Sequence, residues 1–384
     1  MKNIVFDKSN WKKIKLGDIA NDISVRVDNP SESEFERFVG LEHFISGDLK
    51  IKNWSTTENL VSSTKAFKSG DILFARRNAY LRRASLVEFD GVCSGDAFVL
   101  REDNTKIVPG FLTFIVNSER LWDYANANAA GTMSKRVKWR DLANFEFYLP
   151  PIAQQQKLVE LIWSGDFSLQ KFNLLLNAII STKSNYIERA YDLNNKNSVI
   201  NLGSIVKINQ KTLSSRTDVN YLFKYLDISS ITGPGKISEL KEIIFKDSPS
   251  RARRIVQNGD IVMSLVRRYF KCFVIIEEAD NIISSTGTAT ITVSPEFSRD
   301  YVYYCLFHSR FDLMCNERMS GTNYPAITSK DVEEYQIPLK NLTEQKEIGA
   351  VLNKFDYNIR NVEKQIELQR KQISLMINTI LNDI

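Results

Sequence analysis

Two arginine-rich segments carry residue types that bind the phosphates and base edges of nucleic acids. The first follows Gly70-Asp71-Ile72 and the second follows Gly259-Asp260-Ile261. Guanidinium groups form paired hydrogen bonds with phosphates and with the major-groove edge of guanine, and neighbouring tyrosines can pack on sugars or bases. One such run is usually a solvated loop, but recurrence at the same place in two similar sequences favours a DNA contact. The candidates are Arg76, Arg77, Tyr80, Arg82 and Arg83, and, in the second segment, Arg267, Arg268, Tyr269 and Lys271.

A second pair of loops follows a repeated Gly-Thr dipeptide, Gly131-Thr132 and Gly321-Thr322. The first loop is basic and the second is polar and aromatic, so the two keep one frame and differ in chemistry. Two domains that read different DNA sequences need this combination, because phosphate contacts position a domain and variable side chains specify the bases. We therefore expect DNA contacts from Thr132, Ser134, Lys135, Arg136 and Lys138, and from Thr322, Asn323 and Tyr324.

Composition and motifs argue against catalysis in this chain. The 384 residues include only two histidines, His43 and His308. The four cysteines lie far apart, which favours buried thiols in a reducing compartment over disulfides or a zinc site. No Walker loop, dinucleotide-binding fingerprint or amino-methyltransferase motif occurs. The sequence thus predicts no metal site, no cofactor and no enzymatic activity in this chain.

The charge balance permits an anionic partner without requiring one. There are 51 Lys and Arg residues against 46 Asp and Glu, a formal net charge of +5. Any nucleic-acid site must therefore be a local basic face rather than a charged tail. The longest apolar runs are far shorter than a membrane span, and the first residues lead into no secretory core. We expect a cytoplasmic protein without membrane contact.

The chain repeats itself once, at an offset of about 190 residues. A period of this length indicates a duplicated domain rather than a solenoid unit, and two similar domains imply an approximate twofold relation. Besides the landmarks above, Leu16-Gly17-Asp18-Ile19 returns as Leu202-Gly203-Ser204-Ile205, Gly95-Asp96-Ala97 has a looser echo in Gly287-Thr288-Ala289, and Ile152-Ala153-Gln154-Gln155 returns as Leu342-Thr343-Glu344-Gln345.

Within each copy, short β-branched and aromatic runs alternate with turn residues and predict strands, whereas residues 109–124 and 298–315 predict helices. The fold class expected is α+β: two similar mixed α/β domains separated by two long helices that form an antiparallel coiled coil, with a pseudo-twofold axis. The predicted divisions are 1–150 for the first mixed domain, 151–198 for the first helical spacer, 199–341 for the second mixed domain and 342–384 for the second helical spacer.

Each copy ends in a segment with apolar residues at alternating spacings of three and four, the seam of a coiled coil. Lys183 and Gln369 each place a polar residue in the seam, where it could fix register. Ser164-Gly165-Asp166 is expected to interrupt the first helix, with Asp166 as a new cap. Ordinary amphipathic helices, each packed on its own domain, are the alternative. The expected pairing residues are Phe172, Leu176, Ile179 and Tyr186 in the first segment, and Ile359, Val362, Ile366, Ile373, Met376 and Ile380 in the second.

Together these motifs resemble the DNA-specificity subunit of type I restriction-modification systems. The likeness covers essentially the whole chain and is most specific from Gly131 to Gln155 and from Gly321 to Gln345. It implies two target recognition domains, each reading one half of a bipartite duplex DNA site. It also implies helices that dock DNA methyltransferase subunits, expected to be two, and recruitment of the endonuclease and translocase subunits. S-adenosylmethionine, ATP and Mg²⁺ are then expected in those partners.

Two other functions stay open from the residues alone. The chain could be an orphan scaffold or inhibitor that uses its helices for protein contacts without sequence-specific DNA binding. It could also be a nuclease that acts alone, although Glu-x-Lys triplets such as Glu239-Leu240-Lys241 arise by chance. Affinity for random and selected duplexes distinguishes the first, and Mg²⁺-dependent cleavage by the lone chain distinguishes the second.

Overall fold

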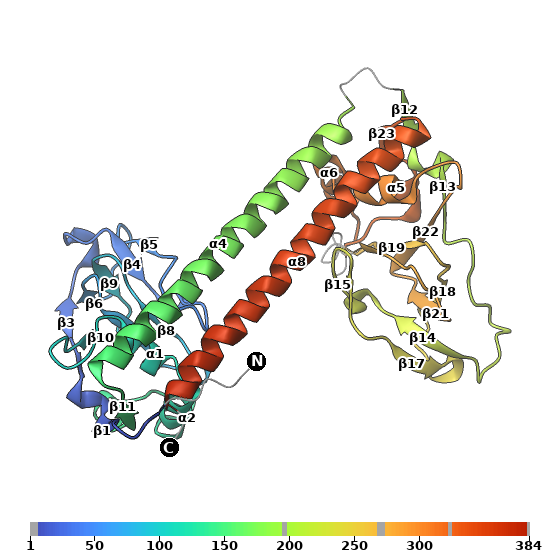
Figure 1. Ribbon diagram of the computed structural model, residues 1–384. Helices are drawn as coiled ribbons and strands as arrows, with labels where there is room; N and C mark the ends of the chain where they lie inside the picture. Colours follow the sequence, from blue (N-terminus) through green and yellow to red (C-terminus); the bar gives the residue numbers. More distant parts are fainter. Residues whose placement is uncertain (1–6, 194–197, 267–272, 322–324, 382–384) are drawn as a thin grey trace. The chain divides into compact units, whose positions relative to one another are not determined.

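The computed structural model describes residues 7–193, 198–266, 273–321 and 325–381, which form two compact units (Figure 1). Unit 1 holds the described residues of Met1–Leu174 and Glu363–Ile384, and unit 2 holds those of Leu175–Val362. The long helices α4 (Ile152–Ala190) and α8 (Leu342–Leu381) contribute to both units. The predicted division instead kept these helices apart from the mixed domains.

Unit 1 contains a four-stranded antiparallel sheet of order β2-β10-β7-β8 and a five-stranded sheet of order β3-β6-β9-β4-β5. In the second sheet β4 and β9 are parallel. Strands β1 and β11 form a separate antiparallel pair. The bounds are β1 Lys12–Lys15, β2 Ala20–Asp22, β3 Val25–Val27, β4 Arg37–Val39, β5 Ser55–Thr56, β6 Thr64–Phe67, β7 Ile72–Ala75, β8 Ala84–Leu86, β9 Gly91–Cys93, β10 Ala97–Glu102 and β11 Glu146–Leu149.

Unit 2 repeats this topology with one strand fewer in its second sheet and an added β15-β16 pair. Its first sheet has the order β13-β22-β19-β20, its second has the order β17-β14-β21-β18 with β14 and β21 parallel, and β12 pairs with β23. The predicted duplication and fold class are therefore confirmed. The bounds are β12 Val199–Asn201, β13 Val206–Ile208, β14 Leu222–Leu226, β15 Ile231–Gly233, β16 Lys236–Ile237, β17 Lys241–Ile244, β18 Ala252–Ile255, β19 Ile261–Ser264, β20 Phe273–Ile275, β21 Ile282–Ser285, β22 Thr288–Val293 and β23 Gln336–Pro338.

The central strands β7 and β19 are buried along their whole length because both of their faces are covered. Successive side chains of a strand point to opposite faces. In unit 1, Phe74 joins the core formed with the helices and stacks on Trp122 (ring centroids 4.6 Å apart), whereas Leu73 joins the core beneath the second sheet. Met263 and Val262 divide in the same way in unit 2. The strand that precedes each arginine segment is thus fixed on both faces.

Each predicted short helix is in fact two helices. In unit 1 the first of the two helices ends before Ser118. Ser118 is the N-cap of the second, because its Oγ accepts the N–H of Leu121. In unit 2, Nδ1 of His308 accepts the N–H of Arg310 and breaks the second stretch in the same way. The bounds are α1 Phe111–Val116, α2 Glu119–Ala127, α3 Trp139–Leu142, α5 Arg299–Cys305, α6 Ser309–Arg318 and α7 Ser329–Glu333.

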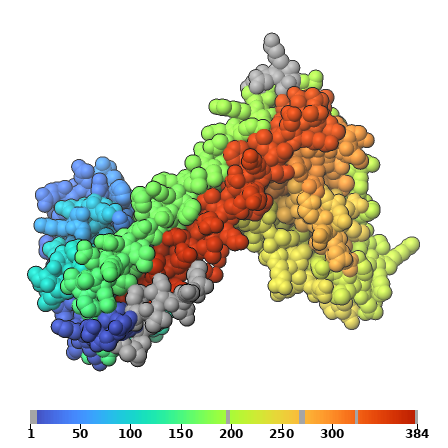
Figure 2. Space-filling model, viewed as in Figure 1, coloured from blue at the N-terminus to red at the C-terminus, as the bar shows by residue number. Residues whose placement is uncertain are grey.

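The long helices pair antiparallel within each unit, and they lie side by side (Figure 1, Figure 2). In unit 1, Nε2 of Gln369 donates to the carbonyl of Gly165 at 3.1 Å. In unit 2, the ring of Tyr186 lies 6.3 Å from that of Phe355. Later residues of α4 therefore contact earlier residues of α8, as expected for two antiparallel helices of a coiled coil. The expected pairing residues are buried (Ile373, Ile380) or half-buried (Phe172, Leu176, Ile179, Tyr186, Ile359, Val362, Ile366, Met376).

The expected interruption at Gly165 is wrong, because α4 continues through it. A Cβ on Gly165 would lie 3.2 Å from Nε2 of Gln369 and 3.3 Å from Cγ1 of Ile373. The missing side chain therefore allows α8 to approach closely. Asp166 is buried inside the helix and accepts a hydrogen bond from Gln170 at 2.6 Å, so it does not cap a new helix.

The repeated glutamines fasten the first turn of each long helix. Nε2 of Gln155 and of Gln345 donates to the carbonyl five residues earlier, at 2.8 Å in both cases. Their Oε1 atoms accept the N–H groups of Val108 and Ser298 at 3.0 and 2.9 Å. Both glutamines are buried, so their hydrogen bonds satisfy polar atoms that burial would otherwise penalise. These landmarks therefore hold the fold together.

Candidate nucleic-acid interface

The Gly-Asp landmark shapes the turn before each arginine segment. Gly70 and Gly259 have positive φ values of 92° and 82°, a conformation that favours glycine. The Asp71 carboxylate accepts the N–H of Lys68 at 2.7 Å and forms two 2.7 Å bonds with Arg101. In unit 2, the Asp260 carboxylate accepts the N–H of Gln257 at 2.8 Å. The aspartates therefore hold the turn and do not face a ligand.

In unit 1 the structure brings the two predicted loops together. We call residues 76–83 the first basic loop and residues 130–138 the second basic loop. The N–H of Asn78 donates to the carbonyl of Lys135, and the N–H of Val137 donates to the carbonyl of Arg76, both at 2.9 Å. Nη2 of Arg77 donates to Oγ of Ser134 at 3.1 Å. Side chains predicted separately from two distant segments thus belong to one surface.

Unit 2 has the same frame. Ser320 and Ala326 exchange backbone hydrogen bonds of 3.0 and 2.9 Å, as Ala130 and Arg136 do in unit 1, and the N–H of Ile327 donates to the carbonyl of Leu265 at 3.0 Å. The segment after β19 therefore meets the segment after the second Gly-Thr. The candidates Arg267, Arg268, Tyr269, Lys271, Thr322, Asn323 and Tyr324 lie outside the described residues.

One carboxylate that the sequence analysis did not single out lies at the centre of this surface in unit 1. Asp96 accepts from Nε and Nη2 of Arg136 at 2.8 and 3.1 Å. Arg76 and Arg77 each approach it to 3.7 Å. The hydrogen bonds from Arg136 hold the pKa of Asp96 below its ordinary value, so the carboxylate stays ionised beside three cations. The cluster keeps an excess of positive charge, as a DNA contact needs.

The predicted residues of unit 1 differ in how open they are. Thr132, Lys135 and Lys138 are exposed, and Tyr80 keeps 66% of its surface accessible, which leaves these four available to a ligand. The half-buried residues are Arg76, Arg77, Arg82, Arg83, Ser134 and Arg136.

Two of the candidate arginines have partners within the protein. Arg83 donates to the carbonyls of Leu41 and Arg77 at 2.9 and 3.3 Å, and burial lowers its pKa. Arg82 lies 3.9 Å from Glu119 and 3.7 Å from Asp123. Arg83 therefore braces the first basic loop from within, while Arg82 is partly neutralised.

Groups that could act as nucleophile or base are restrained. Nδ1 of His43 accepts the N–H of Gly40 at 2.9 Å, so its proton lies on Nε2, which is 3.0 Å from Oγ of Ser55. Histidine in this tautomer cannot take the serine proton. Burial raises the pKa of Cys93 and of Cys315 to about 12, which keeps both as thiols.

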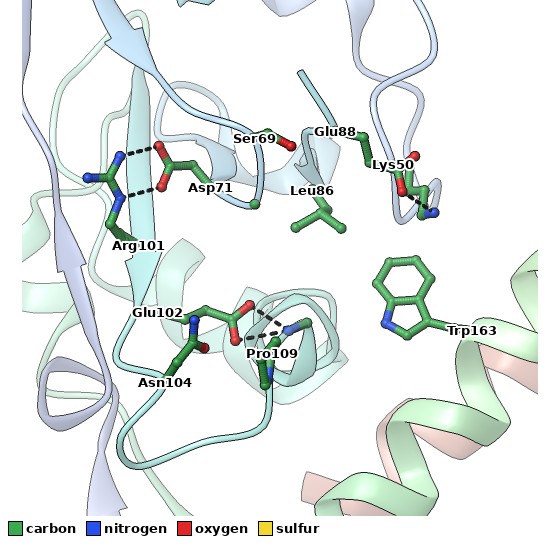
Figure 3. Close-up of a pocket in the computed structure, with 12 residues that line it drawn as sticks. Lys50, Ser69, Asp71, Leu86, Glu88, Arg101, Glu102, Asn104, Pro109 and Trp163 are labelled. Carbon is green, nitrogen blue, oxygen red and sulfur yellow. Dashed lines mark hydrogen bonds and ion pairs between the residues drawn. The ribbon is translucent and has the colours of Figure 1, made fainter. Parts of the chain in front are cut away.

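A pocket of about 510 Å³ lies in unit 1 beside α4 (Figure 3). Its charged side chains are paired with protein groups: Lys50 with Glu88 at 2.6 Å, Asp71 with Arg101, and Glu102 with the N–H of Gly110. Burial raises the pKa of Glu102 to about 7. Across the described residues, no three His, Cys, Asp or Glu side chains gather as a metal site would require. In the same part of the chain, no helix has the length and apolarity to cross a membrane.

Comparison with known proteins finds a matching protein family. A family model for the type I restriction modification DNA specificity domain matches the chain twice, over residues 8–189 and 194–370. The MjaVIII specificity subunit of a type I restriction enzyme from Methanocaldococcus jannaschii is 22% identical, over 96% of this chain and 92% of its own length. The EcoDI specificity subunit of Escherichia coli is 23% identical over 40% of this chain, a match that spans 34% of that relative.

A solved structure has a similar fold. It comes from work on complex assembly and conformational transition of the type I R-M system, and it covers 98% of this chain and 99% of its own. The TM-score is 0.61 and the sequence identity 19%. At that identity the likeness concerns the fold alone.

Proposed function

The chain belongs to the family of type I restriction-modification DNA specificity proteins, and from this premise we propose that it reads a bipartite duplex DNA site, one half-site per unit. One observation carries the proposal: in both units the segment after the central strand meets the segment after the Gly-Thr landmark. A duplicated frame with different side chains presents two reading surfaces of different specificity.

The positive charge of the basic loops supports contact with the DNA backbone. Lys135 and Lys138 are exposed, and Arg76, Arg77 and Arg136 outnumber the one carboxylate they surround. Cations that neutralise phosphates release counterions, so binding of this kind weakens as salt rises. The alternative of an orphan scaffold or inhibitor has no need for such a surface.

We also propose that the long helices dock DNA methyltransferase subunits, two in the full complex, and that endonuclease and translocase subunits join them in the cytoplasm. S-adenosylmethionine, ATP and Mg²⁺ chemistry then belongs to these partners, and this chain catalyses nothing itself. Large apolar side chains exposed on both helices support a protein partner, because such residues gather at interfaces. They include Leu161, Phe167 and Leu174 of α4, and Tyr357 and Leu375 of α8.

Selection from a pool of randomised duplexes tests the DNA-reading proposal. The intact chain should enrich two short motifs separated by a gap of fixed length and unrestricted sequence. Replacement of Arg76, Arg77, Lys135 and Arg136 by Ala should erase the motif of one half-site and leave the other, because the substitutions alter unit 1 alone. The charge-matched control replaces four exposed lysines of the helices, Lys157, Lys346, Lys354 and Lys364. Enrichment of no motif by the intact chain would favour the scaffold alternative.

A further inference from the structure

The two units differ at the position of Asp96. In unit 1 this carboxylate binds the side-on edge of Arg136, formed by Nε and Nη2. The equivalent residue of unit 2 is Gly287, because its carbonyl accepts the N–H of Leu265 at 2.9 Å as the carbonyl of Asp96 accepts the N–H of Arg76 at 3.0 Å. By the same backbone pairing, Ala326 occupies the position of Arg136. The duplicated frame therefore carries an arginine–carboxylate pair in unit 1, where unit 2 has a glycine and an alanine.

Asp96 fixes the orientation of the Arg136 guanidinium without using all of its hydrogen-bond donors. A guanidinium carries two pairs of parallel donors, and the pair formed by Nη1 and Nη2 lies at the end of the side chain. Nη1 of Arg136 is 3.5 Å from the carbonyl of Ser134, a weak contact, and 43% of the Arg136 side chain is exposed. The carboxylate thus fixes the plane of the guanidinium while part of its donor capacity stays open to a ligand.

A fixed plane and a nearby anion suit a base better than a phosphate. The O6 and N7 atoms of guanine accept two parallel hydrogen bonds in one plane and carry no net charge. A phosphate is an anion, and the Asp96 carboxylate, which the arginines keep ionised, weakens the attraction of Arg136 for it. The exposed Lys135 and Lys138 suit the phosphates instead.

We propose, on the basis of the function above, that Arg136 reads a guanine in the half-site of unit 1 and that Asp96 is the positioning residue that fixes its guanidinium plane. Arg77 supports the same geometry, because Nη2 of Arg77 donates to Ser134, whose backbone carbonyl faces Arg136. Asp96 also limits non-specific binding by lowering the attraction of this surface for phosphates.

The test uses the full chain and the duplex enriched in the selection above, with the half-site of unit 1 identified by the fourfold Ala variant. Replacement of the critical guanine by 7-deazaguanine, which lacks N7, removes one of the two acceptors. For the intact chain we expect affinity to fall by about 5- to 150-fold when guanine is replaced by another base, and by less with 7-deazaguanine.

Two substitutions separate positioning from charge. Asp96→Asn removes the anion and keeps the shape, so the preference for guanine should shrink while affinity for random duplex rises severalfold. Arg136→Lys keeps the cation and loses the paired donors, so the preference should disappear without that rise. Persistence of the half-site motif of unit 2 in both variants shows that the protein still folds and binds.

The matched control is Asp28→Asn, because Asp28 also pairs with an arginine, Arg26 at 2.6 Å, on an exposed part of unit 1. It removes the same charge and should leave the guanine preference intact. An unchanged preference in Asp96→Asn, an equal loss in Asp28→Asn, or a half-site of unit 1 without a critical guanine would overturn the inference. Absence of any motif for the intact chain would instead defeat the proposed function.

Discussion

At the scale of single residues, the landmarks that reveal the duplication and the side chains offered to DNA are different sets. Asp71, Asp260, Gln155 and Gln345 are buried and hydrogen-bonded to backbone groups of their own unit. The exposed candidates of unit 1 lie on the basic loops between these landmarks. Substitution at a landmark should therefore reduce stability, whereas substitution at an exposed loop residue should reduce DNA binding.

Glu102 predicts a pH dependence of stability. Its pKa is raised to about 7 by burial, whereas an unfolded glutamate titrates near 4.3. As pH rises between these values the unfolded chain gives up its proton first, so the stability contributed by Glu102 is complete below about pH 4 and is lost as pH rises through about 7. The expected loss is about 3 to 4 kcal/mol.

The variant Glu102→Gln keeps an acceptor for the N–H of Gly110 and does not titrate. Thermal unfolding of both proteins across this pH range should show the intact chain losing stability relative to the variant as pH rises. A difference between the two that does not change with pH would contradict the assignment.

At the scale of elements, the pairing of α4 with α8 depends on close approach at one turn. Gly165 admits Gln369 and Ile373 because it has no side chain. A larger residue at this position must push α8 away or strain its own rotamer, either of which weakens the packing.

We therefore expect Gly165→Leu to lower the free energy of unfolding of unit 1 by about 1 to 3 kcal/mol, as overpacking does. The control is Ser164→Leu, which adds the same side chain one residue earlier at an exposed position. Urea unfolding of both variants measures the effect. Equal stability of the two would show that Gly165 does not set the distance between the helices.

The elements were predictable where the signal was local. Short β-branched and aromatic runs between turn residues predicted strands, and the heptad predicted the second helical spacer over 342–384, where the structure has α8 (Leu342–Leu381). The break at Ser118 was missed although residues 117–120 are polar and Ser118 followed by Glu119 is typical of a helix start. Gly165 was misread because its role depends on Ile373 of another helix, which local propensity does not report.

The site was predictable only in part. Recurrence of arginines and of Gly-Thr located the two basic loops, and the structure joins them through bonds such as Asn78 N–H to Lys135 C=O. Asp96 was missed because its partner Arg136 is forty residues away in sequence. The available signal was the departure from repetition at this position, where unit 2 has Gly287 in place of Asp96.

At the scale of the whole molecule, one chain carries the same frame twice. The strand order of the first sheet, the parallel pair in the second sheet and the glutamine at the start of each long helix all repeat, while the loops after Gly131 and Gly321 differ in composition. A duplicated frame of this kind has room for two independent DNA specificities, and changes in one loop pair should not alter the other half-site.

The most direct test of this central claim is a hydroxyl-radical footprint of the intact chain on the duplex enriched by selection. We expect two protected patches on the DNA, separated by an accessible gap. The fourfold Ala variant of unit 1 should lose one patch and keep the other. A single continuous patch, or loss of both patches together in that variant, would contradict it.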